Sequence, residues 1–274
     1  MFGVSLGIRV GNTNISGGTP LLDLYPSAAA AYSVRKLRAA YTGSAIRVRR
    51  SSDNAEQDIG FSSGNLDTAA LLSFVGTGVL DNGFVTTWYD QSGNANNATQ
   101  TTAINQPQIV SAGVVITNAG KPCLQLDNIN DSLRTSLTIN RPYTISAQFL
   151  QFDTSISRML QSNSAPNALI TSTRPANTVY TDGNVVSNSY ASPNQNVIIS
   201  LIVSTSSTTK FFYNTNNIAT ASPASGNFGQ LCFGFVANNE AGNGQIKETI
   251  VWASDQSSNN TGIQTNMNSY YGIY

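Results

Sequence analysis

The sequence predicts an all-β protein, a two-sheet sandwich of the jelly-roll type that carries one to three short helices. Many short runs of β-branched and aromatic residues are separated by clusters of Asn, Gly, Ser and Pro, at intervals typical of antiparallel sheets. No internal repeat with a fixed period is visible, which disfavours solenoids and propellers. A chain of 274 residues is long enough for one large domain of this class.

The N-terminal residues form a separate pattern. Residues 2–10 alternate apolar with small or polar side chains, as a half-buried strand does, and the flexible segment GNTNISGGTP follows. This strand either completes the sheet of the domain or forms an arm that docks on a partner. We therefore divide the chain into an N-terminal arm, residues 1–20, and a jelly-roll domain, residues 21–274. Neither a secretory signal nor a run of 18 apolar residues is visible, so we expect no export signal and no membrane-spanning helix.

Three segments have the pattern of a helix. Residues 27–41 begin with Ser27 as a hydroxyl N-cap and continue with strong helix formers. Apolar residues recur there at three- to four-residue spacing, and Arg35, Lys36 and Arg38 would lie on or near the solvated side of this helix. Weaker helices are expected at residues 66–76 and in the C-terminal segment NNTGIQTNMNSYYGIY.

From Ser44 onward the period changes from 3.6 to 2, which indicates strands. The runs that we expect to form strands are AIRVRR, GVVIT, CLQLD, YTISAQFLQF, NVIISLIV, KFFYN, QLCFGFV and QIKETIVWAS.

The charge balance argues against a nucleic-acid partner or a membrane-surface partner. Lys plus Arg and Asp plus Glu number 14 each, and no long basic run offers a stripe that would neutralise phosphates. Only 10% of the residues are charged, whereas 31 are Asn. This neutral polar composition fits either a β-rich protein with many Asn and Gly turns or a surface protein whose faces meet sugars or neighbouring subunits.

The chain contains no histidine, which excludes Ser-His-Asp and Cys-His nucleophile systems and any imidazole-bound metal. Cys123 and Cys232 lie 109 positions apart, which is neither a zinc-ligand spacing nor a disulfide framework. We expect two buried thiols, although a pairing between them stays open. The acidic turn at residues 126–132 could hold calcium, but it lacks the Gly and the terminal Glu of an EF-hand loop. We expect no cofactor and no metal.

Carboxylate chemistry remains, above all glycoside hydrolysis, which in most families needs two Asp or Glu side chains across the scissile bond. The supply of glutamates is small: Glu56, Glu240 and Glu248 are the only three, beside eleven Asp. Any catalytic carboxylate between residues 57 and 239 must therefore be an aspartate.

Two groups of charged residues are better explained as structure than as sites. The block RVRRSSDNAEQD, with Arg47, Arg49, Asp53 and Asp58, could clamp a uronic acid through bidentate contacts, but a strand face whose arginines pair with acids of the next turn is the simpler explanation. Asp90 follows the hydrophobic run that ends at Trp88 and Tyr89. It could act on a sugar, yet an aspartate that caps the following turn is the commoner situation.

Four segments together resemble one known family. They are AYSVRKLRAAYTGSAIRVRRSSDNAEQDIGF (31–61), TWYDQSGNANNATQ (87–100), QPQIV (106–110) and ETIVWASDQSSNNTGIQTNMNSYY (248–271). Their order resembles the catalytic domain of α-L-arabinofuranosidase B over roughly residues 22–274, which implies a concanavalin A-like jelly roll. The first segment most closely resembles phage virion and tail proteins that carry the same domain.

The resemblance implies a catalytic glutamate in the middle of the domain and an aspartate acid/base in the loop just before the strand IKETIVW. This sequence has no glutamate in the middle, and the loop reads FVANNEAGNGQ, in which Glu240 is the only acid. The family's adjacent cysteines are missing as well. We therefore predict that the catalytic glutamate and aspartate are absent and that the chain is not an enzyme.

These considerations lead to a functional prediction. We expect a non-catalytic, lectin-like phage virion protein, a capsid decoration, head-fibre or tail-fibre component, which attaches to capsid or tail proteins through residues 1–20 and forms a homo-oligomer. A host cell-surface polysaccharide would bind near the loop above, through Asn238, Asn239, Glu240, Tyr180 and Tyr190. The alternative is a glycoside hydrolase of the arabinofuranosidase type that uses an unrecognised pair of aspartates; turnover of an aryl arabinofuranoside that is lost in Glu240→Gln would support it.

Overall fold

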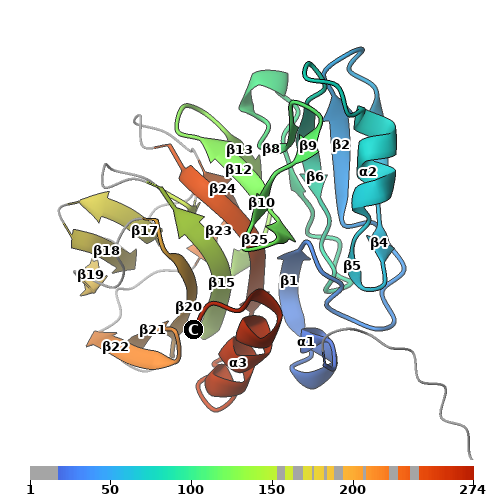
Figure 1. Cartoon of the computed structure of the whole chain (residues 1–274). Coiled ribbons are helices and arrows are strands. Elements are labelled where there is room, and N and C mark those ends of the chain that lie inside the picture. The colour runs from blue at the N-terminus through green and yellow to red at the C-terminus, as the bar shows by residue number, and fades with distance from the viewer. Residues whose placement is uncertain are drawn as a thin grey trace, which may run out of the picture.

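The computed structural model describes residues 18–152, 158–162, 169–174, 176–181, 184–187, 194–205, 208–221, 228–234 and 241–274. Two antiparallel layers of strands face each other, with short helices at their edges (Figure 1). This arrangement confirms the all-β jelly-roll class. The expected strand at residues 2–10 lies outside the described residues.

The first layer is built around one long strand near the C-terminus. The strand β25 (Asn243–Trp252) pairs with β15 (Tyr143–Gln151) on one side, and on the other side with β1 (Ala28–Ser33) and β12 (Leu124–Asp127). Beyond β15 the layer continues through β20 (Asn196–Val203), β21 (Thr209–Tyr213) and β22 (Asn216–Ala221). The outer strands β20, β21 and β22 lie on the same side of the molecule as the helix α3 in Figure 1.

The second layer is longer and more irregular. Its strands are β3 (Glu56–Ile59), β2 (Ile46–Arg50), β6 (Gly83–Trp88), β7 (Ala98–Thr99), β8 (Gln108–Ser111), β9 (Val114–Val115), β13 (Ser132–Arg134), β24 (Leu231–Gly234), β16 (Leu160–Ser162), β17 (Leu169–Arg174), β18 (Ala176–Thr181) and β19 (Asn184–Ser187). Three small ribbons complete the fold: β4 (Phe61–Ser62) with β5 (Asn65–Leu66), β10 (Thr117–Asn118) with β11 (Lys121–Pro122), and β14 (Thr138–Ile139) with β23 (Phe228–Gly229).

The main core fills the space between the layers. In β15 and β20 every second residue faces the main core, as the period of two requires. At the centre, the rings of Tyr32, Trp88 and Phe233 contact one another, with centroids 5.2 to 5.8 Å apart. Such tilted and edge-on aromatic contacts add to the apolar burial that holds the two layers together.

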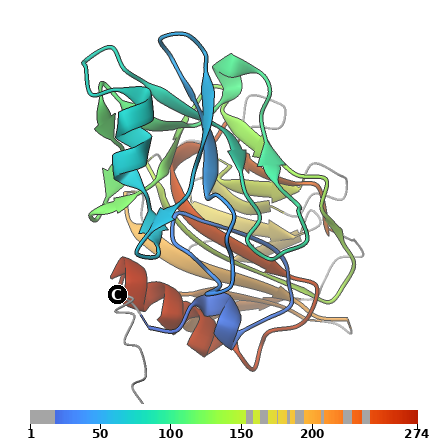
Figure 2. The ribbon, with the colours of Figure 1, turned by 90° about the vertical axis from the view of Figure 1, so that its right-hand side faces the viewer.

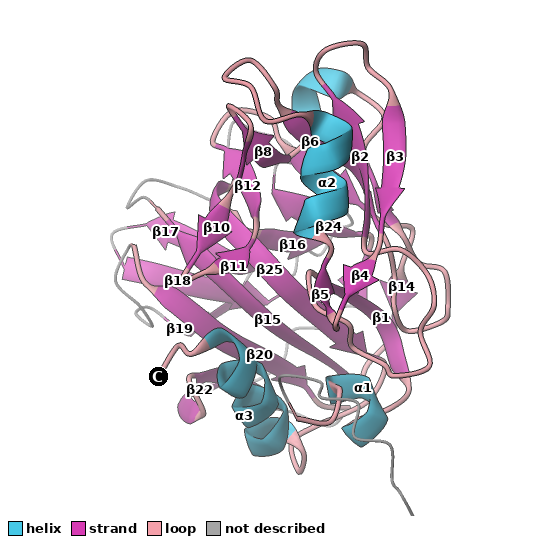
Figure 3. Ribbon diagram, turned by 45° about the vertical axis from the view of Figure 1, so that its right-hand side comes forward, coloured by secondary structure: helices cyan, strands magenta, loops and turns pink. Residues whose placement is uncertain are grey.

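The helices are α1 (Leu21–Leu24), α2 (Thr68–Val75) and α3 (Asn260–Tyr271), and a short 3₁₀ turn spans Ala103–Asn105. The side chain of Asp67 caps α2 by accepting a hydrogen bond from the N–H of Ala70 (2.9 Å). The helix α3 ends at Gly272, which has the left-handed conformation. The two helices predicted at residues 66–76 and in the C-terminal segment are thus confirmed. Helices α1 and α3 lie together against the outer face of the first layer (Figures 2 and 3). Within the described residues, every helix is too short or too polar to cross a membrane.

The helix predicted at residues 27–41 is wrong. Residues 28–33 form the strand β1, which pairs along β25, and Ser27 has a positive φ of 63° instead of capping a helix. Ala30 and Tyr32 face the main core, whereas Ala28 and Ala31 face the second cluster under α1 and α3. Small side chains on both faces let the strand lie between two packed layers, and this pairing overrides the helix propensity of alanine.

The strands predicted from Ser44 onward are present, with shifts of one or two residues at their ends. The run GVVIT is the exception, because it is divided between β9 and β10. The expectation that Arg35 lies on a solvated helix face is also wrong, since only 7% of Arg35 is exposed.

Candidate functional site

Two carboxyl groups meet in the turn between β12 and β13. The Oδ1 atom of Asp127 accepts hydrogen bonds from the N–H groups of Ile129 (2.8 Å), Asn130 (3.1 Å) and Asp131 (3.3 Å). In return, the N–H of Asp127 donates to Oδ2 of Asp131 (3.0 Å). An aspartate followed by Asn and another aspartate favours such a side-chain-to-backbone turn, and Asn128 takes the positive φ of 65° that the turn requires.

Asp131 is a buried carboxyl group that keeps its proton to a much higher pH than an ordinary aspartate. It is 5% exposed, and burial together with the negative charge of Asp127 raises its pKa to about 7, against the opposing effect of the Asp127 N–H. Its Oδ1 has no partner within the described part of the chain, and this oxygen is not among the fully buried polar atoms that lack one. Oδ1 is therefore the atom through which Asp131 can meet a ligand.

This pair of carboxyl groups lies beside the two ends of the segment 235–240. The N–H of Asn128 donates to the carbonyl of Gly242 (3.0 Å), and the carbonyl oxygen of Asp131 would lie only 2.2 Å from a Cβ atom at Gly234. Gly234 has a φ of 84°, so this close approach and this backbone conformation both require glycine. The N–H of Arg158 donates to the carbonyl of Ala241 (3.2 Å), next to Gly242.

The predicted glycan-binding residues cannot be placed in full. Asn238, Asn239, Glu240 and Tyr190 lie outside the described residues. Tyr180 lies on β18, where its backbone is opposite Leu169 and Val185. The turn of Asp127 and Asp131, which the sequence had indicated only as an acidic turn, contacts Gly234 and Gly242 through its backbone.

The charged block on β2, β3 and the turn between them is held by internal pairs. Arg47 binds Asp58 through two hydrogen bonds (2.7 and 2.9 Å), and Arg50 binds Asp53 in the same way (2.8 and 2.7 Å). Arg49 donates to Gln106 and Asn54 and lies over the ring of Phe84, with 4.8 Å from its guanidinium carbon to the ring centroid. The guanidinium groups of Arg47, Arg49 and Arg50 therefore already bind partners within the protein.

Asp90 organises the loop that follows β6. Its Oδ1 accepts from the N–H of Ala31 (2.8 Å) and the N–H of Ser92 (2.8 Å), and its Oδ2 accepts from the hydroxyl of Ser92 (2.8 Å) and the N–H of Asn96 (3.0 Å). Asp90 is 4% exposed, and these four bonds occupy both oxygens. The carboxylate ties the loop to β1 and has no oxygen left to act on a sugar.

A buried ionic network was not foreseen. The carboxylate of Glu248, with no exposed surface, accepts from Arg35 Nε (2.7 Å) and Nη2 (2.8 Å), from the hydroxyl of Ser33 (2.8 Å) and from the hydroxyl of Tyr271 (3.0 Å). Burial alone would lower the pKa of Arg35, but the charge and hydrogen bonds of Glu248 outweigh it and raise that pKa. The only sign of this network in the sequence was the spacing of Ala31, Ser33 and Arg35, which a strand would place on one face.

Lys247 and the cysteines are also buried. The Lys247 ammonium donates to Oδ1 of Asn118 (3.1 Å) and Oδ1 of Asn196 (3.3 Å), and burial lowers its pKa to about 8, with Lys121 acting in the same direction. Cys123 and Cys232 are buried and not joined to each other, and burial raises the pKa of each thiol to about 12. Within the described residues, no group of three or more Cys, Asp or Glu side chains could hold a metal ion.

Comparison with known families identifies similar proteins. The family model of the catalytic domain of α-L-arabinofuranosidase B matches residues 16–140. A GH54 α-L-arabinofuranosidase soaked with a cyclic sulfate inhibitor has a similar structure, with a TM-score of 0.68 at 16% sequence identity. An arabinofuranosidase complexed with arabinofuranosyl-α-1,2-xylobiose gives the same values. Each match covers 90% of this chain but 63% of the other, so the chain spans less than two thirds of the length of these enzymes. No curated protein matches the sequence.

These findings correct the functional prediction made from the sequence. The expected non-catalytic virion protein is wrong, because both the family model and the structural matches point to arabinofuranosidases and neither points to a capsid or tail protein. The same findings overturn the prediction that the chain is not an enzyme. The argument from missing catalytic residues compared positions along the sequence only, and it did not consider carboxyl groups that the fold places elsewhere, such as Asp131 beside Gly234.

Proposed function

We propose that the chain is a glycoside hydrolase of the arabinofuranosidase type, which cleaves α-L-arabinofuranosides. The observation that carries the proposal is the agreement between the family model over residues 16–140 and the structural likeness to arabinofuranosidases over 90% of the chain. The carboxyl groups of Asp127 and Asp131, in the turn that contacts Gly234 and Gly242, offer the acid chemistry that such a reaction needs.

In this proposal Asp131 is the general acid. A glycosidase acid must be protonated at working pH and must release its proton to the leaving-group oxygen, so a pKa near 7 suits the task. Asp127 raises that pKa by its charge, while its own Oδ1 is held by three backbone N–H groups. Asp127 is thus a positioning residue, and Oδ1 of Asp131 faces the substrate.

The second carboxylate is assigned to Glu240. Glycoside hydrolysis needs a nucleophile or a general base opposite the acid. Glu240 directly precedes Ala241, whose carbonyl is bound by Arg158, and Gly242 contacts the turn of Asp127 and Asp131. Among the acidic residues of the sequence, it is the one that falls in the segment between Gly234 and Ala241.

Hydrolysis of 4-nitrophenyl α-L-arabinofuranoside and of an arabinofuranosyl-xylobiose tests the assignment. Asp131→Asn should lower kcat/KM at least 100-fold on the xylobiose substrate but much less on the aryl substrate, because 4-nitrophenolate leaves without a proton. Glu240→Gln should lower kcat/KM on both substrates. Asp53→Asn, which changes an exposed carboxylate in the block after β2, should leave both rates unchanged.

The proposal fails if the purified wild-type protein hydrolyses neither substrate above the buffer rate. If it hydrolyses both and Asp131→Asn loses activity equally on each, Asp131 is not the acid. Circular dichroism of each variant confirms that a loss of rate is not a loss of fold.

A further inference from the structure

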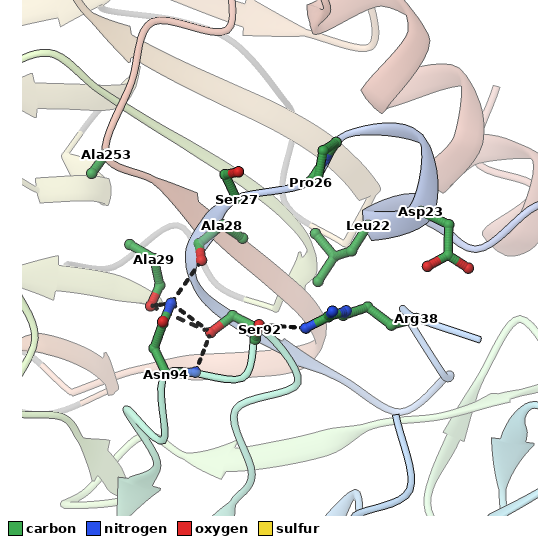
Figure 4. A pocket seen from close by; sticks show the side chains of 10 residues that line it. All are labelled: Leu22, Asp23, Pro26, Ser27, Ala28, Ala29, Arg38, Ser92, Asn94 and Ala253. Atoms are coloured by element: carbon green, nitrogen blue, oxygen red, sulfur yellow. Dashed lines mark hydrogen bonds between the residues drawn. The ribbon is translucent and has the colours of Figure 1, made fainter. Parts of the chain in front are cut away.

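A pocket lies at the opposite end of β25 from the carboxyl pair. It has a volume of about 720 Å³, and its polar lining comes from Asp23, Ser27, Arg38, Ser92 and Asn94 (Figure 4). Ala253, the residue after β25, lines it too, whereas Gly242 at the carboxyl pair lies just before β25. Since β25 contains ten residues, the two sites are roughly 30 Å apart.

One wall of this pocket is rigid because its side chains are bonded to the backbone of β1. The Nδ2 of Asn94 donates to the carbonyls of Ala28 (2.9 Å) and Ala29 (3.1 Å), and Ser92 is held by Asp90. The Oδ1 of Asn94 has no partner within the described part of the chain, so it can accept from a ligand hydroxyl.

Arg38 presents an unpaired positive charge to the pocket. Its Nη1 donates to the carbonyl of Ser92 (2.7 Å), which occupies one of the five N–H donors of a guanidinium. Across the described residues, Arg38 makes no other hydrogen bond and no ion pair. Gly93, with a φ of 97°, leaves room for this side chain, because a Cβ there would lie 3.1 Å from Nη1.

The acid in the lining does not neutralise Arg38. Asp23 is exposed, and its Oδ2 accepts from the N–H of Ala39 (2.9 Å). In Figure 4 the guanidinium extends toward Ser92, and among the described residues no ion pair joins it to Asp23. A planar guanidinium with free donors is the protein group best suited to a bidentate carboxylate contact.

We propose that this pocket binds an acidic sugar, with the carboxylate of a uronic acid on Arg38. The volume is several times that of a carboxylate and lies within the range of small-molecule sites. Ser27 and the free oxygens of Asn94 and Asp23 can bind the ring hydroxyls. The site is separate from the carboxyl pair and does not depend on hydrolysis, so the two proposals can fail independently.

Isothermal titration with trigalacturonate tests the proposal on the full chain. The wild-type protein should bind the acid, and the methyl ester of the same trisaccharide should bind at least tenfold more weakly, because the ester cannot form the charged bidentate contact. Arg38→Ala should weaken binding of the acid at least tenfold, and Arg38→Lys should restore part of it. Lys36→Ala removes one positive charge two residues away, outside the pocket, and should change nothing.

Three results would overturn the proposal. Equal binding of acid and ester by the wild-type protein would show that the carboxylate is not recognised. This comparison uses the wild-type protein alone, so it does not depend on whether a variant folds. Sodium acetate displacing the trisaccharide at equal concentration would indicate a general anion site. Absence of binding at millimolar trigalacturonate would exclude an acidic-sugar site. As a separate control, Asp131→Asn should still bind the trisaccharide, because this pocket is separate from the proposed catalytic residue.

Discussion

Removal of the positive partner of Glu248 should destabilise the protein strongly. Glu248 has no exposed surface, and its carboxylate accepts two hydrogen bonds from Arg35 beside those from Ser33 and Tyr271. In Arg35→Met the two hydroxyls remain, but the carboxylate loses its counter-charge. Breaking a buried ion pair in this way costs about 3–5 kcal/mol. The double variant Arg35→Met/Glu248→Gln leaves neither charge of this pair in the interior and should lose less stability than Arg35→Met alone.

Urea unfolding of the single and double variants gives the coupling energy of the pair. We expect a coupling above about 2 kcal/mol, with unchanged slopes. Arg47→Met is the matched control, because Arg47 makes a similar two-bond pair with Asp58 while both side chains are about 40% exposed. Such a surface pair contributes at most about 1 kcal/mol. If Arg35→Met and Arg47→Met lose the same stability, the argument from burial is refuted.

Two buried titrating groups should give the stability opposite dependences on pH. Burial and Asp127 raise the pKa of Asp131 to about 7 from an ordinary value of 3.8. Between these pH values the native state therefore holds more protons than the unfolded state. The free energy of unfolding should fall by up to roughly 4 kcal/mol as the pH rises from 4 to 7. Asp131→Asn should abolish this loss in urea titrations at pH 4.5 and 7.5; an unchanged difference would mean that Asp131 is ionised. Burial lowers the pKa of Lys247 to about 8 from 10.5. Between these pH values the unfolded state holds more protons than the native state, so the free energy of unfolding should increase as the pH rises from 8 to 10. Lys247→Met should flatten that increase, and the same slope in both proteins would contradict it.

The elements that could be predicted from the sequence are those whose signals are local. The N-cap of α2 at Asp67 and the glycine after α3 act within one turn of their helices, and both helices were found. The strand β1 was missed because its pairing partner lies more than 200 residues away on β25. The alternation of Ala30 and Tyr32 with Ala31 was present in the sequence, but the alanine run favoured a helix.

The same distinction applies to the candidate site. The turn of Asp127 and Asp131 was visible as an acidic segment because its bonds join residues at most four apart. Its position beside Gly234 and Gly242 depends on how β12, β24 and β25 assemble, which no local pattern records. Likewise, the pairing of Arg35 with Glu248 joins residues 213 positions apart.

The bonds of Asp90 make the loop after β6 a natural place for protein engineering. Asp90 fixes the beginning of the loop to β1, and its N–H donates to Oδ1 of Asn97 (3.0 Å), so both ends of residues 91–96 are anchored by side chains that stay in place when the tip is changed. The exposed tip, residues 93–95, borders the pocket of Arg38. A library randomised at residues 94 and 95, with Asp90, Gly93 and Asn97 retained, would therefore sample new ligand preferences on a framework whose core packing is left intact.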